Sequence, residues 1–240
     1  MSNKLLEGKV ALITGASSAM GSAIAKKFIN EGAHVILISR SIDNLNILYN
    51  EIIEEFKELK ENSIILIQLD LLDFENVTLL ANKITNLKLS ESGALDILVG
   101  CAEALGELSP TQDYDLGAVQ NIMDTNFTAN WYLLKNLDPI LKKSDAGRII
   151  FLTSEATLSP SSYPYHGIYA ASKAALETMV KIYASETKHT KLCVNAVYLE
   201  SATDNKKTLS ENDVTELINK FVELASANCS TSGEVRALVN

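Results

Sequence analysis

Seven short and almost wholly apolar runs alternate along the chain with longer amphipathic stretches. Runs that are apolar at nearly every position are typical of strands buried on both faces of a parallel sheet. They lie at Lys9–Thr14, His34–Ser39, Ser63–Leu69, Leu95–Gly100, Arg148–Leu152, Leu192–Val197 and Val235–Val239. The stretches with helical periodicity lie at Ser22–Glu31, Ile42–Lys60, Val77–Thr85, Val119–Leu141, Tyr169–Lys188 and Val214–Ala227. Because repeated strand–helix–strand units form right-handed crossovers, the sequence predicts an α/β fold: a doubly wound parallel sheet of about seven strands with helices on both faces.

Length and composition agree with one folded domain. The chain has 240 residues without a repeat, a linker or a low-complexity tract, so we expect a single domain spanning residues 1–240. Hydrophobic residues make up 47% and charged residues 21%, a balance that excludes a disordered chain. The net charge of −9 and the lack of a basic stripe argue against nucleic acid as a partner.

Cysteine usage and hydropathy indicate a compartment. The three cysteines are widely spaced, which excludes a disulfide framework and fits a reducing cytoplasm. The N-terminus lacks the apolar core of a signal peptide, and no apolar run approaches membrane-spanning length. The three histidines are scattered, without metal-site spacing. We therefore expect a cytoplasmic protein with neither a metal nor a membrane partner.

The first predicted strand runs into a glycine-containing turn and then an alanine-rich helix. The turn reads Thr14-Gly15-Ala16-Ser17-Ser18-Ala19-Met20-Gly21. In such a turn glycine permits a tight bend and a close approach of the backbone to a pyrophosphate, while amides at the helix N-terminus hold the phosphates. Ser17 and Ser18 add hydroxyl donors. A tight connection alone would also explain the glycines, but the strand, serines and helix together favour a nucleotide site.

A second motif lies in the fifth helical stretch, at Tyr169-Ala170-Ala171-Ser172-Lys173. Tyr169 and Lys173 are four residues apart, so their side chains share one helix face. The ammonium would favour the phenolate and lower the pKa of Tyr169, which suits a group that exchanges protons near neutral pH. Such a pair is common, and a solvated lysine beside a half-buried ring is the alternative.

These motifs resemble the short-chain dehydrogenase/reductase family, which carries Thr-Gly-x-x-x-Gly-x-Gly at the first turn and a serine–tyrosine–lysine site. The segment Arg148–Ser154 matches the strand that ends in the family's catalytic serine, here Ser154. Asn126, in Asp124-Thr125-Asn126-Phe127, falls at the family's catalytic asparagine. The resemblance covers essentially the whole chain, implies a single Rossmann-type domain, and is greatest to a branch of poorly characterised bacterial oxidoreductases.

The resemblance also implies a role for each site residue. Tyr169 would exchange a proton with the carbonyl or alcohol oxygen of a substrate, and Ser154 would hydrogen-bond that oxygen. Lys173 would lower the pKa of Tyr169 and bind the nicotinamide ribose, while Asn126 would help to hold a water linking Lys173 to solvent. The nicotinamide supplies the hydride. The cofactor-binding residues implied are Gly15, Ser17, Ser18, Met20, Gly21, Ser39, Arg40, Asp70, Leu71, Cys101, Ala102, Tyr169 and Lys173.

The end of the second strand indicates which nicotinamide cofactor is used. An acidic residue there hydrogen-bonds the ribose hydroxyl of NAD, whereas a basic one accommodates the additional phosphate of NADP. This chain has Ser39-Arg40, and arginine binds phosphate bidentately. The nearest aspartate, Asp43, belongs to the start of the next helix. The sequence therefore predicts NADP(H) rather than NAD(H).

Three cofactor-facing turns depart from the family pattern. Ala19 stands where the family has its second glycine, and Gly100-Cys101-Ala102-Glu103 replaces the usual Asn-Asn-Ala-Gly. Leu199-Glu200 replaces the usual Pro-Gly after the sixth strand. These changes leave weak or unusual cofactor binding open.

Three functions are compatible with the sequence. We favour an NADP(H)-dependent oxidoreductase acting on a small carbonyl or alcohol substrate, and the nearest alternative is a 3-oxoacyl-carrier-protein reductase. A non-catalytic nucleotide-binding or assembly protein on the same fold is the third. By resemblance we also expect a homodimer or homotetramer, formed through the helical stretches Val119–Leu141 and Tyr169–Lys188.

Overall fold

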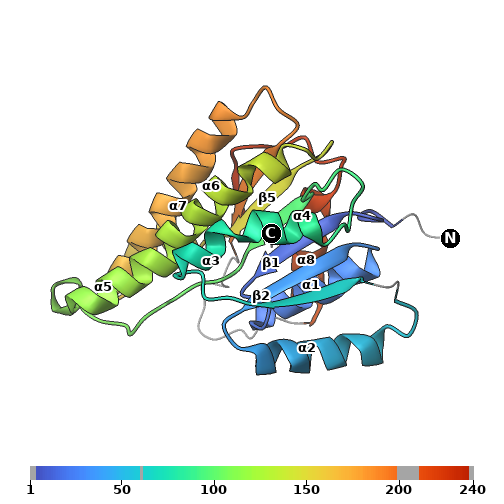
Figure 1. Ribbon diagram of the computed structural model, residues 1–240. Coiled ribbons are helices and arrows are strands. Elements are labelled where there is room, and N and C mark those ends of the chain that lie inside the picture. Colours follow the sequence, from blue (N-terminus) through green and yellow to red (C-terminus); the bar gives the residue numbers. More distant parts are fainter. Residues whose placement is uncertain (1–3, 60–61, 199–210, 238–240) are drawn as a thin grey trace.

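The computed structural model describes residues 4–59, 62–198 and 211–237, and within them one sheet of seven parallel strands (Figure 1). The strands are β1 (Val10–Thr14), β2 (His34–Ser39), β3 (Ile64–Gln68), β4 (Ile97–Gly100), β5 (Arg148–Leu152), β6 (Cys193–Tyr198) and β7 (Val235–Ala237). Their order is β3-β2-β1-β4-β5-β6-β7, so the direction of winding reverses between β1 and β4. This confirms the predicted doubly wound parallel sheet, whose ligand crevice lies at the carboxyl ends of the strands beside that reversal.

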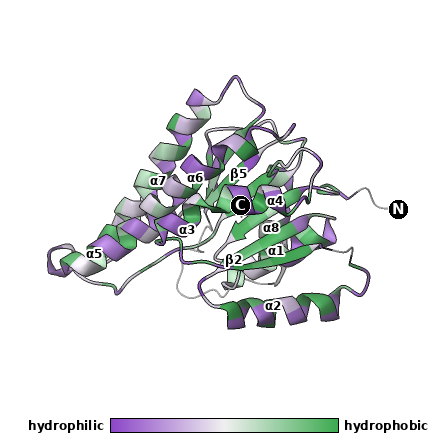
Figure 2. Ribbon diagram, viewed as in Figure 1, coloured by the Kyte–Doolittle hydropathy of each residue, from purple (hydrophilic) through white to green (hydrophobic). Residues whose placement is uncertain are grey.

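One face of the sheet is covered by three helices: α1 (Ala19–Asn30), α2 (Ile42–Glu55) and α8 (Glu211–Ala225). Phe28 of α1, Leu48 of α2 and Phe221 of α8 belong to one buried cluster together with Ile13 and Val99 of the strands. Figure 2 shows the contrast that produces this layer, with mainly apolar strands and helices that alternate between apolar and polar residues.

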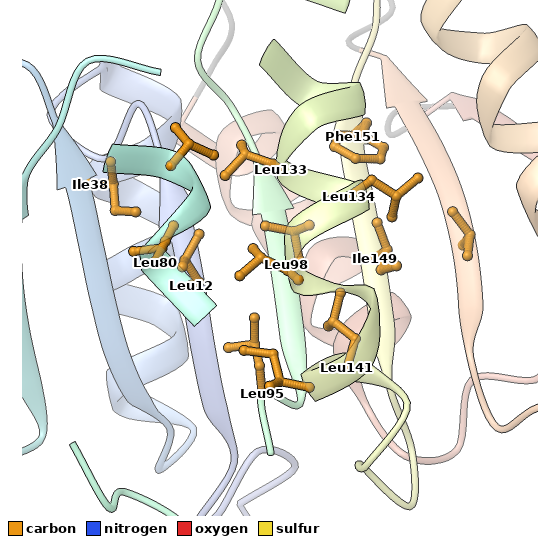
Figure 3. Packing of buried hydrophobic residues seen from close by; sticks show 14 of the residues in the cluster. Leu12, Ile38, Leu80, Leu95, Leu98, Leu133, Leu134, Leu141, Ile149 and Phe151 are labelled. Atoms are coloured by element: carbon orange, nitrogen blue, oxygen red, sulfur yellow. The ribbon is translucent and has the colours of Figure 1, made fainter. Parts of the chain in front are cut away.

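The other face is covered by α3 (Phe74–Thr78), α4 (Leu80–Asn86), α6 (Ala129–Leu141) and α7 (Gly167–Glu186). Figure 3 shows Leu133 and Leu134 of α6 lying over Leu98 and Ile149 of the strands. Each fully buried leucine contributes about 1.5–3 kcal/mol to folding relative to its exposed state. The prediction of helices on both faces is therefore confirmed. These helices hold in place the strands whose carboxyl ends carry the site. A further helix, α5 (Leu116–Met123), extends beyond the sheet (Figure 1).

Two predicted helices are interrupted. The stretch Val77–Thr85 is two short helices, α3 and α4, and the Thr78 hydroxyl at the end of α3 donates to the carbonyl of Phe74 (2.8 Å). The stretch Val119–Leu141 starts earlier, as α5, and passes through a π-helical turn at Asp124–Thr128 before α6. The predicted Ser22–Glu31 helix also starts earlier, at Ala19, because Ser18 caps it.

Charged side chains at the amino ends of the strands form hydrogen bonds with backbone groups and with a buried hydroxyl. Asp96 accepts hydrogen bonds from the Val10 amide (2.9 Å) and the Ser144 hydroxyl (2.6 Å), and Lys9 lies 3.5 Å away. The guanidinium of Arg148, only 4% exposed, donates to the carbonyls of Ser226, Gly147, Ala227 and Cys229 at 2.9 Å each. These contacts join the start of β5 to the segment after α8.

Candidate active site

A cavity of about 620 Å³ lies at the carboxyl ends of the strands, beside the reversal between β1 and β4. Ten of the predicted cofactor-binding residues line it: Gly15, Ser17, Ser18, Met20, Ser39, Arg40, Asp70, Leu71, Cys101 and Ala102. Ala19, Leu72, Glu103 and Thr125 also line it. The segments that follow four neighbouring strands thus meet at one crevice, as the sheet topology requires.

The turn after β1 forms one wall of the cavity. Gly15 has a φ of +61°, and a Cβ on it would lie 2.7 Å from the amide nitrogen of Ala102. Any side chain there would be both strained and in collision with the neighbouring turn. The Ser18 hydroxyl caps helix α1 by accepting a hydrogen bond from the Gly21 amide (3.1 Å). Ala19 is the first residue of that helix, so its methyl group is accommodated in an ordinary backbone conformation.

Gly21 does not line the cavity but lies behind the turn. A Cβ there would lie 2.3 Å from the carbonyl oxygen of Gly15. Because Gly21 has no side chain, helix α1 can pack against the turn. Gly21 thus positions the helix and does not contact the cavity itself.

The end of β2 forms a second wall. The hydroxyls of Ser17 and Ser39 are 2.8 Å apart, a contact that joins the turn after β1 to this strand end. The side chain of Arg40 is exposed, whereas its carbonyl accepts a bond from the Gln68 side chain (3.0 Å). Asp43 lies in the first turn of α2, as expected. An exposed guanidinium with no carboxylate at this strand end makes this part of the cavity favourable for an anion.

Tyr169, Lys173 and Glu103 form a compact polar cluster, of which Glu103 lines the cavity, whereas Tyr169 and Lys173 are not among its lining residues. Lys173 is 1% exposed, and its Nζ donates to the carbonyl of Leu152 (2.9 Å) and lies 2.9 Å from Oε2 of Glu103. The Tyr169 hydroxyl donates to the same Oε2 (3.1 Å). Nζ of Lys173 is 5.5 Å from the centre of the Tyr169 ring, which confirms the shared helix face.

The pKa of Tyr169 is raised above its ordinary value. Burial is the largest cause, and the charge and hydrogen bond of Glu103 add to it, while the Ser154 hydroxyl acts in the opposite direction. The predicted lowering by Lys173 is therefore wrong for this structure. The positive charge of Lys173 is compensated by Glu103, and the phenol donates to a carboxylate that favours its protonated form.

Ser154 follows β5 and faces the Tyr169 hydroxyl, on whose pKa it acts. Its side chain caps a short 3-10 turn (Glu155–Thr157), because its Oγ accepts from the Ala156 amide (3.2 Å). The buried carboxylate of Glu177, on α7, accepts hydrogen bonds from Thr153 and Thr157, both at 2.6 Å. The residues on either side of Ser154 are thus attached to the helix that carries Tyr169 and Lys173.

Asn126 lies in the π-helical turn, fully buried, and braces the segment after β4. Its Oδ1 accepts from the Ala104 amide (2.7 Å), and its Nδ2 donates to the Ala104 carbonyl and the Ser172 hydroxyl, both at 2.9 Å. The π-helical turn brings Asn126 within reach of both partners, and such turns occur frequently at functional sites. Its predicted water-holding role stays a prediction.

Two loops lie beside the cluster. Tyr114 donates to the carbonyl of Tyr165 (2.8 Å), which ties the loop after β4 to the loop after β5. The ring of His166 lies edge-on to that of Tyr169, with centroids 6.4 Å apart. Leu199 and Glu200, the third departure from the family pattern, lie outside the described residues.

The family pattern described as short chain dehydrogenase matches residues 9–213 of the sequence. The chain belongs to the short-chain dehydrogenase family.

Relatives and solved structures agree with this assignment. The uncharacterized oxidoreductase YciK of Escherichia coli is 33% identical over 195 residues, which are 80% of this chain and 73% of that protein. An uncharacterized oxidoreductase of Mycobacterium tuberculosis is 29% identical over 200 residues; this chain spans only 56% of its length. A putative short-chain dehydrogenase from Escherichia coli, solved in complex with NADPH, is 26% identical, with a TM-score of 0.83 and 99% of each chain covered.

Short-chain dehydrogenases bind a nicotinamide cofactor, and most of this cavity fits one. Gly15 leaves the space that a Cβ would fill, the N-terminus of α1 faces the cavity, and Arg40 contributes a cation. One described residue fits it poorly: Glu103, whose carboxylate contacts both Tyr169 and Lys173.

Three features of the site escaped the sequence prediction. The contacts of Glu103 were missed, although its replacement of a glycine was a visible signal. The buried role of Glu177 could not be predicted, because its position is typical of a charged residue on an amphipathic helix. The π-helical turn gave no signal either, since Asp124–Thr128 fits the helical periodicity on both sides.

Within the described ranges, no group of three or more His, Cys, Asp or Glu side chains could hold a metal ion. Of the helices that the structure describes, none is long and apolar enough to cross a membrane. Cys101, at the cavity wall, is buried, and burial raises the pKa of its thiol to about 12. That thiol stays protonated near neutral pH and is not a nucleophile there.

Proposed function

We propose that this protein is an NADP(H)-dependent oxidoreductase that interconverts a carbonyl group and an alcohol on a small molecule. The observation that carries the proposal is the meeting of Ser154 and Lys173 at Tyr169, beside a cavity that also contains Arg40. Ser154 follows β5, Lys173 and Tyr169 belong to α7, and Arg40 follows β2; Glu103, which contacts Tyr169 and Lys173, connects this cluster to the cavity that Arg40 lines.

The chemistry assigned to the residues follows from their positions. The cofactor, when bound, supplies or accepts the hydride. During reduction the substrate oxygen gains negative charge and needs a proton, which the O–H of Tyr169 donates. The Ser154 hydroxyl donates a hydrogen bond to the same oxygen and orients it. Lys173, 5.5 Å from the ring centre, stabilises the phenolate that remains.

Arg40 supports NADP(H) rather than NAD(H). Its exposed guanidinium lies where the additional phosphate of NADP would bind, and Ser39 beside it is already fixed by Ser17. The structural relatives solved with NADPH and with NADP support the same choice.

Fluorescence titration with NADPH and NADH tests the proposal, followed by a screen of carbonyl compounds that measures NADPH consumption. We expect saturable binding with NADPH preferred. If neither cofactor binds at physiological concentration, the protein is a non-catalytic member of its family.

We also propose that residues 1–240 form one cytoplasmic domain that associates as a homodimer or homotetramer. Trp131 of α6 is 44% exposed and Ile182 of α7 is 54% exposed, and both border the same groove as Phe127 and Met179. Light scattering coupled to size-exclusion chromatography tests this, and a monomer at micromolar concentration would contradict it.

A further inference from the structure

Glu103 places a carboxylate on the two groups that the proposed reaction needs. Its Oε2 lies 2.9 Å from Nζ of Lys173 and 3.1 Å from the Tyr169 hydroxyl, so a single oxygen contacts both. The Glu103 side chain is 38% exposed and lines the cavity, whereas Lys173 and Tyr169 are buried. The carboxylate therefore lies at the boundary between the buried pair and the space in which a ligand would bind.

The hydrogen bond from Tyr169 to Glu103 excludes another one. A phenol has a single O–H, so while Tyr169 donates to Glu103 it cannot donate to a substrate oxygen. Lys173 donates to the Leu152 carbonyl and forms an ion pair with Glu103, so two of its three N–H donors have partners and its charge is compensated. The Tyr169 O–H becomes available to a ligand only when the carboxylate moves away.

The backbone around Glu103 is fixed on both sides. The Ala102 amide donates to the Thr14 hydroxyl (3.4 Å), and both backbone polar groups of Ala104 are bonded to the side chain of Asn126 (2.7 and 2.9 Å). A loop shift is therefore disfavoured, while rotation of the partly exposed side chain about its own bonds places the carboxylate in water. The contact can open without disturbing the site around it.

We propose that Glu103 is an autoinhibitory carboxylate, which occupies the Tyr169–Lys173 pair in the free protein and must be displaced before cofactor and substrate bind productively. The inference rests on the proposed function. It means that the free protein is a closed form of the enzyme, in which the internal carboxylate competes with any ligand that needs these two donors.

The test is the affinity for NADPH of the full-length protein and two variants, measured by fluorescence titration. Glu103→Gln keeps the shape of the side chain and removes its charge, and Glu103→Gly removes the side chain. We expect the dissociation constant to fall at least about tenfold in Glu103→Gly, equivalent to about 1.4 kcal/mol, and by a smaller factor in Glu103→Gln. Glu107→Gln, an exposed carboxylate on the same loop, is the matched control and should leave the affinity unchanged.

The outcomes separate this inference from the function on which it rests. If wild type and both Glu103 variants bind NADPH equally, the autoinhibitory role is wrong and the proposed function stands. If Glu107→Gln tightens binding as much as Glu103→Gln, the effect is one of general charge, and the inference is again overturned. If no form binds NADPH, the proposed function fails and this inference falls with it. Glu103→Gln keeps the test valid if Glu103→Gly, which leaves Lys173 without a counter-charge, does not fold.

Discussion

The two ends of the sheet hold their buried charges in different ways. At the amino ends, the Arg148 guanidinium donates to backbone carbonyls at 2.9 Å, and Asp96 is held by a backbone amide and a buried hydroxyl. At the carboxyl ends, the Lys173 ammonium has one backbone carbonyl and one partly exposed carboxylate, Glu103. Partners that belong to the backbone cannot leave without unfolding, whereas a side chain that reaches water can. The first arrangement suits stability and the second suits ligand binding.

Of the mutations expected to distinguish the two ends of the sheet, a mutation of Tyr169 should have the largest effect. Tyr169→Phe removes the O–H that we assign as proton donor to the substrate oxygen, so we expect carbonyl reduction to fall about 10²–10⁴-fold. NADPH affinity and the thermal midpoint should change little by comparison. Tyr49→Phe, an exposed ring on α2, is the control. A fully active Tyr169→Phe protein would contradict the assignment of the proton donor.

At the amino ends the effect should fall on stability instead. Arg148→Met leaves several buried carbonyls without a donor, and we expect the free energy of unfolding to drop by about 3 kcal/mol. For a chain of this size, that corresponds to a thermal midpoint lower by roughly 6–12 °C.

Lys191→Met is the comparison for Arg148→Met, because it removes an exposed ion pair with Asp145. Because both side chains are exposed to water, this pair should contribute little to stability. Urea unfolding measures the free energy of unfolding of both variants. An equal decrease in the two would show that the buried carbonyls do not need the Arg148 guanidinium as their hydrogen-bond donor.

A smaller effect is expected at the outer part of the cavity. Arg40→Ala should weaken NADPH binding about tenfold by removing a charged donor to the additional phosphate, while NADH binding stays nearly constant. Parallel fluorescence titrations measure the ratio. An unchanged preference for NADPH over NADH would place the phosphate-binding group elsewhere.

The smallest effect concerns alkaline pH. The pKa values of Tyr169 and Tyr183 are both raised, chiefly by burial and then by Glu103 and Asp138 respectively. A tyrosine whose pKa is higher in the folded than in the unfolded state contributes stability that is present below about pH 10 and is lost as the pH rises beyond it.

In Tyr183→Phe, the free energy of unfolding should therefore decrease less steeply as the pH rises from about 10 to about 12. Glu103→Gln should have the same effect, because it lowers the pKa of Tyr169 toward the ordinary value. Urea unfolding at several pH values measures the slope, and identical slopes in wild type and both variants would rule out these linkages.

Local pattern was enough to predict the sheet, and it also singled out residues that the structure brings close together. The apolar runs gave all seven strands to within about two residues at each end, because burial on both faces leaves little choice of residue. Ser154, Tyr169 and Lys173 were predicted to share one site, and the structure places them together at the carboxyl ends of the strands.

Features that depend on contacts between distant segments were not predictable in the same way. The pKa of Tyr169 was predicted in the wrong direction, because it depends on burial and on where the side chain of Glu103, 66 residues away, points. The π-helical turn at Asn126 is fixed by Ala104 and Ser172, neither of which is close to it in the sequence. Periodicity carries no information about such partners.

The Glu177 carboxylate has a consequence for how the site moves. By accepting from Thr153 and Thr157, it joins the Ser154 segment to the helix that bears Tyr169 and Lys173, and we expect these three residues to move together. Among the described residues, Glu177 has no hydrogen bond to the cavity walls that follow β1, β2 and β3. Under the proposed function, we therefore expect mutations that change cofactor preference while the geometry of proton transfer is kept, and the reverse.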